Sequence, residues 1–169
     1  MRWRYRLWQM WLNFTVKEAL PSPARQEIAT VLSPAEMRLF DRFSPRDQQH
    51  SYLVYQTLLR TGHTAPPLLA AALLHDIGKT QTPLTPWDRM LPVLVERIAP
   101  RLAQRWGAGE PRGWRRPFVV RQQHPAWGAK MAQAAGSHPL TVALINHHQD
   151  KLSPHDHLLR ALQWADEQS

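Results

Sequence analysis

The sequence contains no cysteine, which excludes disulfide bonds and thiolate metal sites. It also lacks any uninterrupted run of about 18 apolar residues, so it predicts no membrane-spanning helix. No segment alternates apolar and polar residues for long enough to predict a half-buried β-strand. These absences predict an all-helical domain. Any transition metal in it would have to be held by His, Asp or Glu.

Acidic residues are scarce. The chain has 13 Asp plus Glu against 21 Lys plus Arg, a formal net charge of +8. This excess favours an anionic partner such as phosphates, nucleic acid or an acidic membrane surface, although it also serves solubility alone. With 169 residues and 43% hydrophobic residues, one compact domain with a real core is expected. A cytoplasmic location, with or without peripheral attachment to a membrane, fits these features.

The first 16 residues predict an amphipathic helix that is rich in Trp and Arg. One face would carry a stripe of large apolar side chains, namely Trp3, Leu7, Met10, Trp11 and Phe14. Such a helix can pack on its own domain, on a partner, or on an anionic bilayer. We therefore predict an N-terminal helical extension over residues 1–32 and a main domain over residues 33–169.

Proline and capping residues mark most helix starts in the main domain, with capping-box patterns at Ser33-Pro34-Ala35-Glu36, Ser44-Pro45-Arg46-Asp47 and Thr85-Pro86-Trp87-Asp88. Gly78 is predicted to stop the most apolar helix, and His124-Pro125 to start a separate one. Residues 114–123 fit either a helix or an extended segment. The predicted helices are residues 24–32, 34–43, 45–61, 66–76, 86–98, 100–106, 126–135, 140–148 and 156–168.

Several polar residues fall at helix ends or on inner faces. His50 shares a helix face with Leu53, Val54 and Leu58, which aims its imidazole at the core. An imidazole and a carboxylate at the end of a buried helix need compensation, and a bound cation provides it. The candidate set in chain order is His50, His75, Asp76, His124, His147, His148 and Asp166.

With its central stretch AALLHDIGK, an upstream His50 and a late Asp166 in LQWADE, the chain resembles the HD-domain phosphohydrolase superfamily over residues 44–169. The resemblance implies an all-α HD-domain helical bundle, to which the N-terminal amphipathic helix is an addition. It also implies one divalent ion on His50, His75, Asp76 and Asp166.

With its additional histidines the chain resembles the two-metal subfamilies, namely the HD-GYP phosphodiesterases and the symmetrical dinucleotide hydrolases. There Asp76 would bridge two ions, and His124 with His147 or His148 would complete the second. However, the chain contains neither Gly-Tyr-Pro nor a His-Thr-Thr-Gly-like stretch, so the resemblance does not carry over a substrate. The alternative for His124 is a capping residue before Pro125, and His124 decides between one ion and two.

The resemblance implies metal-dependent hydrolysis of a phosphomonoester, phosphodiester or phosphoanhydride bond in a small nucleotide-like substrate. Iron or manganese is favoured, and zinc, magnesium and nickel are compatible with the ligands. Asp76 and Lys79 are the predicted catalytic residues, and Lys79 and His148 the predicted substrate contacts.

Two other functions stay open. The first is a regulatory metal- or nucleotide-binding module without turnover, which acts at a membrane surface or a protein partner. The second is action on RNA or single-stranded DNA, because Trp and Arg are interleaved at residues 1–11 and 106–116. Asp150 is expected to be a loop acid, with proton transfer as the alternative. The remaining histidines are expected to be solvated, namely His63, His138, His155 and His157.

Overall fold

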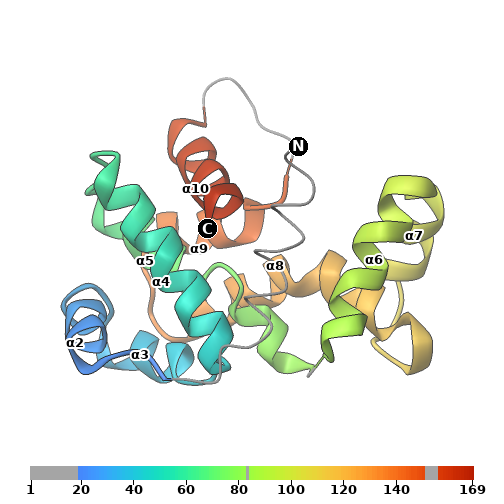
Figure 1. Ribbon diagram of the computed structural model, residues 1–169, viewed down its shortest axis with the longest axis horizontal. Coiled ribbons are helices and arrows are strands. Elements are labelled where there is room, and N and C mark those ends of the chain that lie inside the picture. Colours follow the sequence, from blue (N-terminus) through green and yellow to red (C-terminus); the bar gives the residue numbers. More distant parts are fainter. Residues whose placement is uncertain (1–18, 83, 151–155) are drawn as a thin grey trace.

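The computed structural model describes residues 19–82, 84–150 and 156–169, and within these ranges the protein is helical and contains no β-strand (Figure 1). The predicted all-α fold is confirmed. The amphipathic helix predicted for residues 1–16 lies outside the described residues. The α-helices are α2 (Ser22–Val31), α3 (Pro34–Phe40), α4 (Pro45–Arg60), α5 (Pro66–Leu74), α6 (Pro86–Ile98), α7 (Pro100–Gly107), α8 (Arg116–Ala134), α9 (Pro139–His147) and α10 (His157–Gln168). Two short 3-10 helices, η1 (Ile77–Gln81) and η2 (Gly113–Arg115), complete the chain.

Helix α5 lies at the centre of the bundle and packs against α2, α3, α4, α9 and α10. Every residue from Leu68 to Leu74 is buried. Each fully buried leucine stabilises the fold by about 1.5–3 kcal/mol. The run of alanines at 70–72 lets neighbouring helices approach this helix closely.

The predicted helix starts at Ser33 and Thr85 are full capping boxes with Glu36 and Asp88. At the start of α4 the prediction is only half right. The Ser44 hydroxyl accepts from the Asp47 backbone N–H, but the Asp47 carboxylate does not return a bond to the Ser44 backbone. It binds the guanidinium of Arg89 instead. Asp47 therefore joins α4 to α6.

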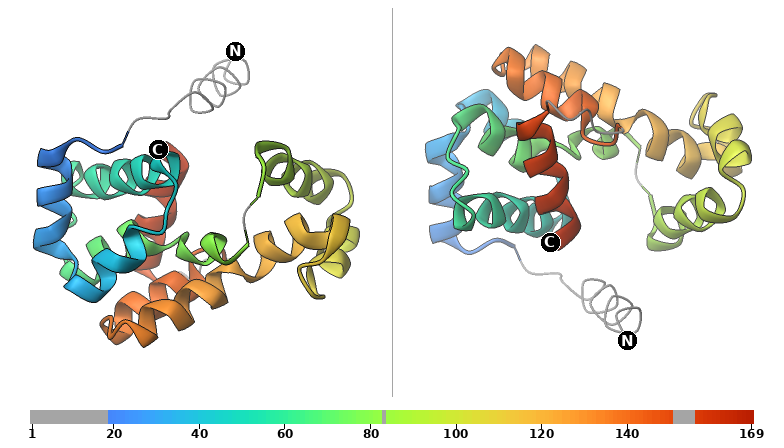
Figure 2. Two further views of the ribbon diagram at one scale, coloured as in Figure 1. Left: turned by 90° about the horizontal axis from the view of Figure 1, so that it is seen from below. Right: turned by 90° about the horizontal axis from the view of Figure 1, so that it is seen from above.

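Helix α8 corrects two expectations. Residues 116–134 form one continuous helix, so residues 114–123 are largely helical and His124-Pro125 does not begin a new helix. Pro125 lies in the helix interior, where it removes one backbone N–H. Because the helix is continuous, α8 reaches from the α6–α7 hairpin to α9 (Figure 2). It also packs along η1.

An aromatic cluster joins α7, η2 and α8. The Trp106 ring contacts Trp114 and Phe118 edge-on, with ring centroids 4.9 and 5.0 Å apart. The Arg115 guanidinium lies over the Trp114 ring, 5.2 Å from its centroid. The interleaving of Trp and Arg at residues 106–116 thus has a packing explanation.

No helix in the described ranges is both long and apolar enough to cross a membrane. Ile28 and Leu32 belong to the same hydrophobic core as α5. The predicted division into an N-terminal extension over residues 1–32 and a main domain over residues 33–169 stays a prediction.

Candidate metal centre

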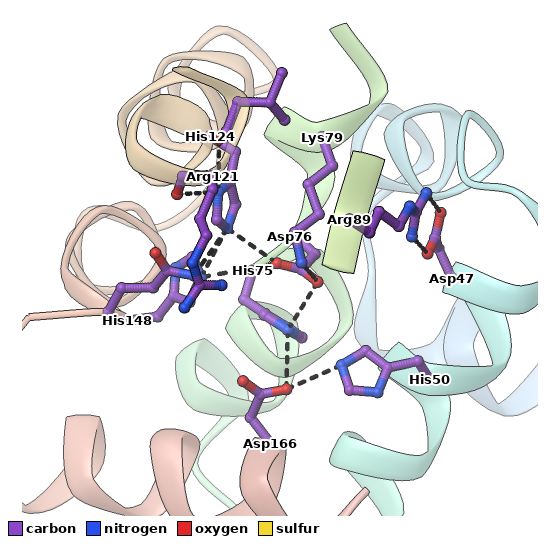
Figure 3. A network of polar contacts seen from close by, with 12 residues as sticks. Asp47, His50, His75, Asp76, Lys79, Arg89, Arg121, His124, His148 and Asp166 are labelled. Atoms are coloured by element: carbon purple, nitrogen blue, oxygen red, sulfur yellow. Dashed lines mark hydrogen bonds and ion pairs between the residues drawn. The ribbon is translucent and has the colours of Figure 1, made fainter. Parts of the chain in front are cut away.

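The buried helix α5 delivers His75 and Asp76 to the centre of a polar cluster (Figure 3). The helix ends at Leu74, and His75 and Asp76 form the turn that leads into η1. The His75 side chain is 1% exposed and the Asp76 side chain 9%. Two groups of potential metal ligands meet at this turn, and no more than these two occur among the described residues.

The first group, the outer triad, consists of His50 from α4, His75 and Asp166 from α10. Asp166 Oδ1 lies 2.9 Å from His50 Nε2 and 3.5 Å from His75 Nε2. His75 Nε2 is buried and has no hydrogen-bond partner among the described residues. A buried ring nitrogen without a partner is costly unless a ligand occupies that direction. His50 is half-buried rather than fully aimed at the core, and Leu53 on the same helix is exposed.

The second group, the inner triad, consists of Asp76, His124 from α8 and His148, which follows α9. Asp76 Oδ1 lies 3.2 Å from His124 Nε2 and 3.7 Å from His148 Nε2. The two Nε2 atoms are 3.2 Å apart. Both histidine side chains are almost completely buried.

Asp76 connects the two triads through its two oxygens. Oδ1 faces His124 and His148, whereas Oδ2 lies 3.6 Å from His75 Nε2 and also accepts an ion pair from Lys79. A carboxylate with one oxygen on each side is suited to bridge two cations.

Backbone carbonyls fix the orientation of the three buried histidines. The Nδ1 atoms of His75 and His148 lie 2.9 and 2.7 Å from the carbonyl oxygens of Ala72 and Ile145. Because a carbonyl can only accept, each Nδ1 carries the proton and each Nε2 faces the cluster as a potential ligand.

Pro125 creates an equivalent anchor for His124. A residue with a backbone N–H at position 125 would bond to the carbonyl of Arg121, but proline cannot. The His124 Nδ1 lies 3.0 Å from that Arg121 oxygen and 3.0 Å from the Val120 oxygen. The proline that suggested a helix start therefore releases an acceptor that orients a candidate ligand.

The charges in the cluster favour a cation. Burial lowers the pKa of His75, but the charges of Asp76 and Asp166 outweigh it and raise this pKa to about 9. Burial, together with the charge of His75, lowers the pKa of His148 to about 3. Burial also lowers the pKa of His124. For Asp76 burial acts the other way, yet Lys79 and His75 hold its pKa well below the usual value.

The inner triad consequently presents three acceptors to one another. The contacts of both Nδ1 atoms with backbone carbonyls direct the Nε2 atoms of His124 and His148 at Asp76, and burial lowers the pKa of both histidines. These three atoms lie 3.2–3.7 Å from one another, and the side-chain amide nitrogen of Gln149 lies 3.4 Å from His124 Nε2, so a cation among them would be stabilised. The donor set therefore fits a divalent ion of the kind that prefers imidazole and carboxylate.

A comparison with protein families matches residues 48–169 to the HD domain. The chain belongs to the HD-domain family. The predicted membership of this superfamily of metal-dependent hydrolases is confirmed. No curated protein and no solved structure matches the chain significantly.

Gly78 is important for the geometry of this cluster, but for a reason that differs from the prediction. It is not a left-handed helix stop; it lies buried within η1. A Cβ atom at this position would lie 2.0 Å from the carbonyl oxygen of His124 and 2.8 Å from the backbone nitrogen of Gly128. The absence of a side chain lets η1 approach α8 closely, so that Asp76 can reach His124.

The structure separates His147 from the cluster. Its side chain is exposed, with Nδ1 2.6 Å from a carboxylate oxygen of Asp150 and Nε2 3.2 Å from the Asn146 amide nitrogen. Of the two neighbouring histidines, His148 is therefore the one whose ring lies in the inner triad. Among the other histidines, His138 caps α9 through Nδ1, His63 is half-buried, His157 is exposed, and His155 lies outside the described residues.

Sequence reasoning named Lys79 but missed two other basic residues beside the outer triad, Arg46 and Arg89. A cavity of about 230 Å³ has a lining that includes His50, Asp76, Arg46, Asp47, Lys79 and Arg89. Arg89 is fixed by two hydrogen bonds to Asp47, of 2.6 and 3.0 Å. The Ser-Pro-Arg-Asp start of α4 was the available signal, because it places Arg46 one turn before His50 on the same helix.

Proposed function

We propose that this HD domain is a metal-dependent phosphohydrolase that acts on a small phosphorylated, nucleotide-like substrate and uses two divalent ions. The observation that carries the proposal is the shared carboxylate: Asp76 turns one oxygen to each of two ligand triads. His50, His75, Asp166 and Asp76 Oδ2 would hold one ion. Asp76 Oδ1, His124 and His148 would hold the other, and His147 is not included.

Iron or manganese suits this set of imidazoles and carboxylates without thiolates. Bound divalent ions lower the pKa of water towards neutrality and draw charge from a phosphoryl oxygen. The protein itself fixes the geometry, because carbonyl-anchored imidazoles and a buried carboxylate need little rearrangement on binding.

Lys79 supplies a positive charge beside the outer triad. Its ammonium group contacts Asp76 Oδ2, its side chain is 30% exposed, and it lines the cavity beside the outer triad. From there it can bind a phosphoryl oxygen of the substrate and offset the negative charge that develops during hydrolysis. His148 is too deeply buried for the substrate contact that the sequence suggested, and we assign it to the inner triad.

Metal analysis of the purified protein and a substrate screen test the proposal together. We expect about two ions per chain, and turnover of a nucleotide or simple phosphate ester when manganese or iron is present. A single ion that is unaffected by His124→Ala would exclude the two-ion site.

A protein that retains its metal but turns over no phosphate ester, nucleotide or dinucleotide would support a non-catalytic binding module instead. The screen should include short RNA and single-stranded DNA. Exclusive turnover of these substrates would replace the small-molecule substrate in the proposal by a nucleic acid.

A further inference from the structure

Helix α6 presents an apolar stripe to solvent, formed by Trp87, Leu91, Leu94 and Ile98. These residues follow one another at intervals of four, three and four positions, so their side chains lie on one face of the helix. All four are between 46% and 78% exposed. At a rise of about 1.5 Å per residue, the stripe is about 17 Å long. Single exposed apolar side chains are ordinary, whereas a continuous row of them marks an interaction surface.

The opposite face of α6 attaches the helix to the bundle. Pro92 is buried, and Asp88 and Glu96 form ion pairs with Arg116 and Arg121 of α8, at 3.2 and 2.7 Å. These three α6 positions are four residues apart and share one helix face. The apolar stripe is therefore left largely uncovered by the described residues. Helices α6 and α7 lie at the end of the molecule that is remote from α2 and α3 (Figure 1).

The α6–α7 hairpin and the turn that follows it are strongly basic. Residues 86–116 contain seven arginines and only three acidic residues. All three acids already pair with arginines, at 2.7–3.9 Å. Arg97, Arg101 and Arg105 are exposed, and Arg97 borders the apolar stripe, three residues after Leu94. The exposed side of the hairpin thus combines apolar side chains with positive charge, which suits an anionic surface.

This charge pattern limits what can cover the stripe. A second copy of the chain, docked through the same face, would bring the arginines of two hairpins together, which is unfavourable. The stripe is the convex side of a single helix and not a groove that could receive a helix or an extended peptide. A tryptophan and aliphatic side chains beside arginine are the combination that amphipathic helices place at an anionic bilayer.

We propose that the outer face of α6 docks the protein on an anionic lipid bilayer. The apolar stripe enters the boundary between the headgroups and the acyl chains, and Arg97 binds lipid phosphates at its edge. The other exposed arginines of the hairpin attract the anionic surface from a distance. The inference does not depend on the proposed hydrolysis, because none of these residues belongs to either triad.

Co-sedimentation of the full chain with lipid vesicles tests the docking. We expect binding to phosphatidylcholine vesicles that contain about 30% phosphatidylserine, and at least about tenfold weaker binding to phosphatidylcholine alone. The double variant Leu94→Gln, Ile98→Gln should weaken binding at least about tenfold, and Arg97→Gln about fivefold. Leu140→Gln on α9 and Arg38→Gln on α3 alter exposed residues of the same types and should leave binding unchanged.

The absence of cysteine from the chain allows a second, local measurement. Leu94→Cys, labelled with a polarity-sensitive thiol dye, should show blue-shifted emission on the anionic vesicles. Leu140→Cys with the same dye should not, because it reports on a helix outside the hairpin. This signal is specific to α6 even where another segment, such as residues 1–16, also binds lipid.

Unshifted emission of the Leu94→Cys label on anionic vesicles, or unchanged binding of the double variant, would overturn the proposal and favour a protein partner or another lipid-binding segment. Equal binding to the uncharged vesicles would overturn the role of the arginines. A shift that appears without lipid, as the protein concentration rises, would assign the stripe to a second copy of the chain. Metal content and turnover should be unaffected by all these variants, so this proposal and the proposed function fail separately.

Discussion

The two triads that meet at Asp76 differ most in their access to solvent. In the outer triad the side chains of His50 and Asp166 are 32% and 38% exposed, whereas His124 and His148 of the inner triad are 0% and 3% exposed. The outer triad also borders the cavity of about 230 Å³ that Lys79 and Arg89 line. We infer that the inner triad is a fixed anchor and that exchange with solvent and substrate takes place at the outer one.

Removing the Asp76 carboxylate, which both triads share, should impair the two triads together. Asp76→Asn keeps the shape of the side chain but weakens both proposed ion sites, so activity should fall by about three orders of magnitude, or about 4 kcal/mol of transition-state stabilisation. Metal content should fall from two ions towards none. Unfolding experiments should also show a loss of about 3–5 kcal/mol, because Lys79 and His75 lose their buried partner. Retention of both ions would contradict the bridging role.

A matched pair of histidine variants separates the triads. His50→Ala and His124→Ala should each reduce the metal content from about two ions to one, with an affinity loss of at least about 100-fold at the altered triad. The ion left in His50→Ala should exchange slowly with chelator, because it lies in the buried triad. The ion left in His124→Ala should exchange quickly.

His147→Ala is the control for this pair. Its side chain is exposed and its ring nitrogens pair with Asn146 and Asp150, outside both triads, so metal content should not change. Loss of an ion in His147→Ala would show that the inner triad has been assigned the wrong member of the histidine pair.

Crowding the contact between η1 and α8 should affect the inner triad first. Gly78→Ala places a methyl group 2.0 Å from the carbonyl oxygen of His124, so one of the two helices has to move. We expect a loss of about 3 kcal/mol in unfolding free energy and weaker binding of the ion at the inner triad. Gly109→Ala, where an added Cβ meets no atom within 4 Å, should change neither. Unchanged stability in Gly78→Ala would argue against the close approach.

The smallest effect is expected from the residue that frees a carbonyl for His124. Pro125→Ala restores a backbone N–H that competes with His124 Nδ1 for the Arg121 oxygen. Because the Val120 oxygen remains as a second acceptor, metal affinity at the inner triad should fall by only about tenfold. Pro92→Ala, which alters an interior proline of α6, provides the comparison and should leave metal affinity unchanged. An equal loss in both variants would assign the effect to helix stability alone.

The parts of the site that were predictable are those that local patterns encode. The apolar helix before His75 and Asp76, and the placement of His50 and Asp166 in flanking helices, follow from periodicity and from the resemblance to the HD superfamily. Pro125 misled the prediction because proline at a helix start and proline in a helix interior look alike in sequence, and only the packing of α8 distinguishes them.

Other features depend on contacts across long stretches of chain. Asp47 and Arg89 are 42 residues apart, and their pairing requires α4 and α6 to be placed side by side. The distinction between His147 and His148 depends on where the last turn of α9 ends, since one residue of difference turns a side chain from the cluster to solvent. Gly78 was predicted in the right place for the wrong reason, because the sequence does not reveal which backbone will lie against it.

The two oxygens of Asp76 have a thermodynamic consequence. A single negative charge faces both triads, so a cation bound on one side reduces the attraction on the other. This coupling is reciprocal: by whatever factor occupancy of the outer triad lowers affinity at the inner triad, occupancy of the inner triad lowers affinity at the outer one by the same factor. The protein should therefore bind its two ions in order, with a lower affinity for the second than for the first. The concentration of free metal, relative to the affinity for the second ion, would then set the fraction of chains that carry both.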